Sequence, residues 1–178
     1  WQITLEFLSI VTDYLPAQLA ERQRSSPGAH RSAMIDAEAA RLARNPPPGP
    51  VIAAGSTGSI PATARLLAAI ARCPQGAVVL PGLDKELDAR AWAELGRADA
   101  PPSTFGHPQY GLHKLLARLG VSRESVAEIA AAAPDLASRA RFVSDALRPA
   151  ETTDLWRAGG ATGLDGVALV EAANEREE

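Results

Sequence analysis

The sequence predicts an α/β fold with a small parallel sheet of about three strands. Two short apolar runs, Val51–Ala54 and Ala77–Leu80, are typical of strands that are covered on both faces. The segment between them, residues 60–72, has the apolar spacing of a helix. A strand, a helix and a second strand in this order predict a βαβ unit with parallel strands. The third strand is expected within residues 167–174.

The composition favours one domain with a hydrophobic core in a reducing compartment. The chain has 178 residues, of which 46% are hydrophobic and 22% are charged, and its net charge is −3. This balance excludes a broad basic surface, so any contact with nucleic acid would be local. Cys73 is the only cysteine, which excludes an internal disulfide and a cysteine metal cluster and favours a cytoplasmic location. No apolar run reaches the length of a membrane span.

A helical lead-in is expected over residues 1–45. Its first helix, residues 2–22, places apolar side chains on one face, and Pro16 predicts either a kink or a division into two helices. A second helix is expected over residues 29–44. The proline-rich connector at residues 45–50 then predicts a stiff, extended segment.

The βαβ core is expected over residues 51–85 and turns at a glycine-rich segment. Gly55 and Gly58 allow the backbone to take positive φ angles after the first strand. Ser59 is a good helix N-cap, and Pro61 suits the first helical turn because its missing N–H has no helical partner there. These residues predict a sharp turn from the first strand into the helix.

A helical insertion is expected over residues 86–158. Its first helix, residues 86–95, is expected to direct Trp92 and Leu95 inward. Gly120 is expected to end the second helix by taking a left-handed backbone conformation. The further helices are expected over residues 110–119, 122–132, 134–147 and 151–157.

The best candidate for a ligand site is the turn after the first strand together with an acid after the second. Both follow the C-terminal ends of predicted parallel strands, where α/β proteins bind ligands. The candidate residues are Gly55, Ser56, Thr57, Gly58, Ser59 and Asp84. The turn lacks the lysine of a Walker A loop and does not match the G-x-G-x-x-G or G-x-S-x-G patterns. A tight structural turn is therefore favoured over a phosphate cradle.

Acidic and histidine side chains give little support for a metal site. The acids that follow the second strand are Asp84, Glu86, Asp88 and Glu94. They could hold Mg²⁺ or transfer protons, but the last three are expected early on a helix, where they complement its dipole. The three histidines are His30, His107 and His113, and they lack the spacing of metal ligands. We therefore expect no metal in this chain.

A set of arginines on the later helices provides the candidate contacts to DNA phosphates. These residues are Arg139, Arg141, Arg148 and Arg157. Acidic side chains alternate with them along the chain, for example Asp135, Asp145 and Asp154. A solvated surface of mixed charge is therefore the favoured interpretation.

Several segments, in this order along the chain, resemble the AddB subunits of bacterial AddAB helicase–nucleases, which repair DNA double-strand breaks. The segments are Leu5–Thr12, Val51–Leu67, Gly76–Asp84, His107–Leu112 and Leu169–Glu177. The resemblance covers nearly the whole chain. It implies an internal piece of the N-terminal half of such a subunit, with a P-loop fold related to superfamily 1 helicases.

The resemblance also implies that the motor chemistry is lost in this segment. In a working helicase of this class, a strand that carries an Asp-Glu pair holds Mg²⁺ for ATP hydrolysis. The matching residues here are Ala53, Ala54, Gly55 and Ser56, and none is a carboxylate. The next strand should lead into a Gly-Asp-x-x-Gln pattern, but Pro81–Asp84 has no glutamine. No catalytic residue is therefore expected.

The function implied by the resemblance is scaffolding, lining of a DNA channel and contact with an AddA-type motor subunit. In that family, ATP and Mg²⁺ act at the motor subunit, and an iron–sulphur cluster lies in the C-terminal nuclease region, so no cofactor is expected in this chain. The alternative is an independent nucleotide- or small-molecule-binding α/β enzyme that uses the turn at Gly55–Ser59 and Asp84.

Overall fold

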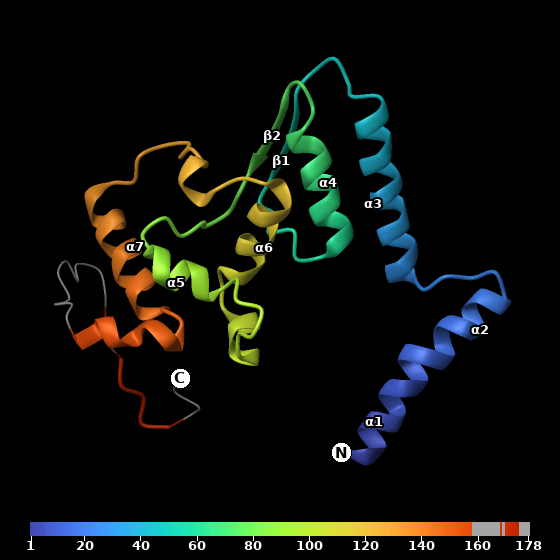
Figure 1. The fold of residues 1–178 in the computed structure, drawn as a ribbon, viewed down its shortest axis with the longest axis horizontal. Coiled ribbons are helices and arrows are strands. Elements are labelled where there is room, and N and C mark those ends of the chain that lie inside the picture. The colour runs from blue at the N-terminus through green and yellow to red at the C-terminus, as the bar shows by residue number, and fades with distance from the viewer. Residues whose placement is uncertain (158–167, 169, 175–178) are drawn as a thin grey trace. The chain divides into compact units, whose positions relative to one another are not determined.

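The structure, a computed structural model, describes residues 1–157, 168 and 170–174 (Figure 1). The chain divides into two compact units, Trp1–Val79 and Leu80–Glu178. The described residues are mostly helical and contain one parallel sheet of two strands. The prediction of a mixed α/β fold with parallel strands is therefore confirmed. No helix in the described ranges is long and apolar enough to cross a membrane.

The first unit begins with a helix that changes its hydrogen-bonding pattern before Pro16. Helix α1, Gln2–Ser9, continues through a π-helical segment η1, Ile10–Tyr14, into α2, Leu15–Glu21. The N–H of Leu15 bonds to the carbonyl of Ile10, five residues back, so the ladder widens next to the proline, which has no N–H. The helix is thus interrupted where Pro16 predicted it, by a π turn between two α-helices. None of its residues is buried.

Helix α3, Pro27–Arg44, packs against α4, Pro61–Ala71 (Figure 1). Helix α3 begins two residues before the expected start because the Ser26 side chain accepts a hydrogen bond from the N–H of Ala29, at 3.1 Å. The guanidinium of Arg65 holds both oxygens of Asp36 at 2.7 Å, which adds a bidentate contact between the two helices.

The sheet pairs β1, Val51–Ala54, with β2, Gly76–Val79, in parallel. Helix α4 packs against both strands, yet the side chain of Ile52 is 67% exposed. The expectation that β1 is covered on both faces is therefore wrong, because the described elements of the first unit supply a covering helix for one face only. The strand expected within residues 167–174 is not confirmed. Residues 167 and 169 lie outside the described residues, and residues 168 and 170–174 form neither helix nor strand.

The second unit is built from short helices joined by turns. Its α-helices are α5, Ala89–Glu94, α6, Tyr110–Leu119, and α7, Pro134–Ala146. Its 3₁₀ helices are η2, Pro102–Gly106, η3, Arg123–Ser125, and η4, Ala150–Arg157. Helix α6 has the expected bounds and ends at Gly120, whose φ of 68° is left-handed.

The helix expected over residues 122–132 is wrong. Only the 3₁₀ turn η3 forms there, after which Val126 takes an extended conformation. Ile129 is 82% exposed, so the segment has no buried apolar face that could stabilise a helix by packing. The local sequence pattern of residues 122–132 is therefore not sufficient to form a helix.

The core of the second unit lies around α5 and α6. Leu87 and Leu95 are buried beside α5, and the half-buried Trp92 packs against this cluster. The inward direction expected for Trp92 and Leu95 is therefore confirmed. The Trp92 ring also contacts the guanidinium of Arg123, at 4.8 Å, and the ring of His113, at 5.0 Å between centroids.

We predict that Gly76→Ala destabilises the first unit. A Cβ atom at this position would lie 1.8 Å from the carbonyl oxygen of Ile70, which is backbone and can move only with the end of α4. Overpacking of this kind costs about 2–3 kcal/mol. Gly49→Ala is the matched control, since its Cβ would meet no atom within 4 Å. Thermal unfolding followed by circular dichroism measures both, and equal melting temperatures for the two variants would contradict the β2–α4 packing.

Candidate functional site

The predicted turn after β1 has the expected backbone geometry. Gly55 and Gly58 take positive φ angles of 79° and 64°. The Ser56 side chain accepts a hydrogen bond from the N–H of Gly58, at 3.3 Å, so this hydroxyl stabilises the turn itself. Thr57 is half-buried and Ser59 is exposed. The turn therefore presents backbone and small side chains, and no charged group.

The sequence predicted that Ser59 caps helix α4, and this prediction is wrong. The N-cap is Ile60, which has extended dihedral angles and provides no capping hydrogen bond, and Pro61 is the first helical residue. The physical reason is the proline ring, which disfavours helical geometry in the residue before it. The residue next to Pro61 is therefore forced into the cap position, and Ser59 lies one residue too early.

Asp84 stabilises a loop in the second unit. One carboxylate oxygen accepts hydrogen bonds from the N–H groups of Glu86 and Leu87, both at 2.9 Å. The N–H of Asp84 donates to the side-chain oxygen of Gln109, at 3.0 Å. The amide nitrogen of Gln109 donates in turn to the carbonyl of Gly82, at 2.9 Å. The Gly55–Ser59 turn belongs to the first unit and Asp84 to the second.

The other acids of the predicted cluster have structural contacts that differ from one another. Asp88 is the N-cap of α5 and accepts a hydrogen bond from the N–H of Ala91, at 2.9 Å. Glu94 is the last residue of α5 and pairs with Arg97 at 2.8 Å, and Glu86 precedes the helix. The expectation that all three lie early on a helix is therefore wrong, because α5 starts at residue 89. In the described ranges, no group of three potential ligands could hold a metal ion.

The candidate arginines occupy different environments. The side chain of Arg148 is only 10% exposed and contacts the carboxylates of Asp88 and Asp145. Arg141 and Arg157 are exposed, while Arg139 is half-buried and lines a pocket. Two of the four, Arg141 and Arg157, are therefore exposed cations.

The histidines have structural contacts. One ring nitrogen of His107, Nδ1, accepts a hydrogen bond from the N–H of Gln109, at 3.1 Å. The other, Nε2, lies 2.6 Å from the carbonyl oxygen of Leu147, so it carries the proton. Burial lowers the pKa of His113, which packs against Trp92. His30 is exposed on α3.

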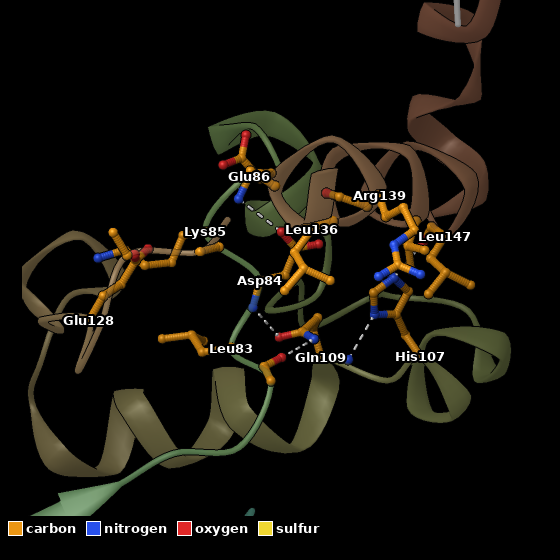
Figure 2. A pocket seen from close by; sticks show the side chains of 17 residues that line it. Leu83, Asp84, Lys85, Glu86, His107, Gln109, Glu128, Leu136, Arg139 and Leu147 are labelled. Carbon is orange, nitrogen blue, oxygen red and sulfur yellow. Dashed lines mark hydrogen bonds between the residues drawn. The ribbon is translucent and has the colours of Figure 1, made fainter. Parts of the chain in front are cut away.

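A pocket that was not predicted lies within the second unit (Figure 2). Its volume is about 690 Å³. Apolar side chains of α7 and the residue after it line one side, and the loop at residues 82–86 with His107 and Gln109 lines another. The α7 spacing is visible in the sequence as apolar residues at 136, 140, 143 and 147. Such an apolar stripe usually packs against the hydrophobic core. Its periodicity therefore does not distinguish the wall of a pocket from a packed helix face.

Comparisons with known proteins give no family for this chain. No protein-family model, no curated protein and no solved structure matches it. The resemblance to AddB subunits therefore stays a prediction from the sequence.

We predict that Asp88→Asn lowers stability at neutral pH. The N–H of Ala91 and the guanidinium of Arg148 hold the pKa of Asp88 below its ordinary value of 3.8. A carboxylate with a lowered pKa stabilises the fold fully above its unfolded pKa, and this contribution is lost as the pH falls through the folded pKa. Asparagine can still cap α5 but loses the charge, so we expect a loss of about 1 kcal/mol after solvent screening.

Urea unfolding between pH 7 and pH 3 tests this prediction. The difference between the wild-type chain and Asp88→Asn should be largest near neutral pH and should shrink below pH 3.8. Asp13→Asn is the control, because this exposed carboxylate has no hydrogen bond or ion pair with any described residue. A difference that stays constant over the whole range would exclude the charge of Asp88 as its cause.

Proposed function

We propose that this chain is a non-catalytic, helicase-like segment of an AddB-type subunit of a DNA double-strand-break repair helicase–nuclease. Its function is scaffolding, lining of a DNA channel and contact with an AddA-type motor subunit. The observation that supports this best is the β1–α4–β2 unit. Its two strands are parallel and a glycine turn follows β1, but no acid stands at the end of β1.

ATP hydrolysis by a helicase motor depends on carboxylates that hold Mg²⁺ beside the phosphates. After β1, the chain offers Gly55, Ser56 and Thr57 at the place where such a motor has its acids. The Ser56 hydroxyl is already bonded to the turn. We infer that the segment keeps the strand, turn and helix of a motor fold without its metal ligands. On this proposal, ATP and Mg²⁺ act at the partner motor subunit, and the iron–sulphur cluster belongs to the C-terminal nuclease region of the intact subunit.

Exposed apolar side chains in the first unit support a scaffolding function. On α1, Ile3 is 83% exposed and Phe7 is 61% exposed, and Tyr14 on η1 is 67% exposed. Ile52 on the sheet is 67% exposed. Large apolar surfaces of this kind mark sites of association. They are the surfaces that a larger subunit or a partner would cover.

A direct contribution to DNA binding is expected to be small. The net charge of −3 repels a polyanion, and Arg148 is held by two carboxylates. The exposed Arg141 and Arg157 are the available phosphate contacts of the candidate set. We therefore expect weak binding of single-stranded DNA that depends strongly on salt.

A second candidate function is an independent α/β enzyme that binds a nucleotide or small molecule at the Gly55–Ser59 turn. The positive φ angles of Gly55 and Gly58 favour this reading, since they allow close approach of a ligand to the backbone. Asp84, the acid that the sequence offered for such an enzyme, belongs to the second unit, where its carboxylate accepts two backbone hydrogen bonds.

The two functions differ in their response to ATP and Mg²⁺. A specific site saturated at about 100 times its Kd would stabilise the chain by about 2.7 kcal/mol. We expect no such gain for this chain, so differential scanning fluorimetry with and without ATP and Mg²⁺ should give equal melting temperatures. A rise that is lost in Gly55→Ala, where the φ of 79° strains any other residue, would favour the enzyme.

Fluorescence anisotropy with a labelled oligothymidine tests the DNA contacts. The double variant Arg141→Gln/Arg157→Gln should bind several-fold more weakly and reduce the salt slope by about 1.4. Arg44→Gln/Arg72→Gln removes the same charge from exposed positions in the first unit and should change binding less. An equal loss in both double variants would show attraction by net charge rather than a contact surface.

A further inference from the structure

The pocket of the second unit has the size and the lining of a small-molecule site. Its volume of about 690 Å³ lies within the range of about 300–1,000 Å³ that such sites have. One side is the apolar stripe of α7, where Leu136 is 47% exposed and Val143 is 50% exposed. Leu147, directly after α7, extends this stripe and is 45% exposed. A flexible hydrocarbon or an aromatic body would cover these side chains.

Arg139 differs from the other arginines that are shielded from solvent. In the described part of the chain, three arginines are buried or half-buried, namely Arg123, Arg139 and Arg148. Arg123 pairs with Glu124 and packs on Trp92, and Arg148 pairs with two aspartates. Arg139 forms no hydrogen bond and no ion pair with any described residue, although it lines the pocket. A half-buried guanidinium favours an anionic partner that can accept its hydrogen bonds.

Three other polar side chains of the pocket have hydrogen-bond partners within the second unit. The ammonium of Lys85 donates to the carbonyl of Val126. Both ends of the Gln109 amide are bonded, to Asp84 and to Gly82, and the protonated nitrogen of His107 is bonded to Leu147. The ammonium of Lys85 keeps two further N–H donors, but it lies toward Glu128 (Figure 2). Arg139 is therefore the lining cation that forms no hydrogen bond with a described residue.

The charge around the pocket disfavours a ligand with several anionic groups. Three carboxylates line it, from Asp84, Glu86 and Glu128, against the two cations Lys85 and Arg139. In Figure 2, Glu128 and Lys85 lie toward one end, while Arg139 lies toward the other, near Leu147. A polyanion such as a nucleoside triphosphate would meet these carboxylates and be repelled.

We propose that this pocket binds a small molecule with one carboxylate and an apolar body. The carboxylate pairs with Arg139, and the apolar body lies along Leu136, Val143 and Leu147. Arg139 sets the specificity for an anion, and the α7 stripe supplies the contact area. This site lies wholly within the second unit and does not depend on the helicase-like assignment or on the Gly55 turn.

A titration of the full ¹⁵N-labelled chain, followed by two-dimensional NMR, tests the proposal. The probe is octanoate, and the control is octylammonium, which has the same chain with the opposite charge. Octanoate should shift the amide signals of residues 82–86 and 136–147 in a saturable way, at least about tenfold more tightly than octylammonium. Equal affinity for the two probes, or shifts confined to the exposed apolar helix of residues 2–21, would overturn the proposal.

Variants of α7 locate the charge that is recognised. Arg139→Gln should weaken octanoate binding about tenfold, while Arg139→Lys should retain part of it. Arg141→Gln removes the same charge from an exposed residue of α7 that does not line the pocket, and it should bind octanoate as the wild-type chain does. If Arg139→Gln binds as tightly as the wild-type chain, the proposal fails. If that variant does not fold, the comparison of octanoate with octylammonium decides.

Discussion

The second unit depends on the contact of Arg148 with Asp88 and Asp145. Asp88 begins α5, Asp145 lies in the last turn of α7, and the nearly buried guanidinium joins them. The indole N–H of Trp156 donates to the backbone carbonyl of Asp145, at 2.6 Å, which ties η4 to the same place. Removal of either aspartate would leave the shielded guanidinium with a single carboxylate, and removal of Arg148 would leave both aspartates without this cation. The position of α7, and with it the wall of the pocket, follows from this network.

The sequence predicted those elements whose signals are local and strong. The apolar runs at β1 and β2, the proline at the start of α4 and the glycine after α6 place these elements within about two residues. The failures depend on tertiary context. The helix expected over residues 122–132 has no surface to pack against, and coverage of β1 on both faces would need an element that the described first unit lacks.

The backbone geometry of the candidate turn could be predicted from the sequence, but the contacts of the candidate side chains could not. Glycines at 55 and 58 take the positive φ angles that their residue type permits. The function of Asp84 depends on Gln109, which is 25 residues away and became its partner only through the fold. The pocket beside Arg139 could not be predicted, because it arises where a periodic apolar face stays uncovered. A sequence pattern shows which side chains a segment could bury, whereas the tertiary fold determines which of these side chains stay exposed.

The two-stranded sheet has a consequence for the behaviour of the isolated chain. In a sheet of two strands, each strand is an edge strand with one row of N–H and C=O groups that face no neighbour in the sheet. A sheet of this size needs a packed helix for its stability, and here α4 provides it. Any event that frays α4 therefore also uncovers one face of a sheet whose edges are already open. At high concentration, the route to aggregation of this protein would begin with strand addition at this sheet.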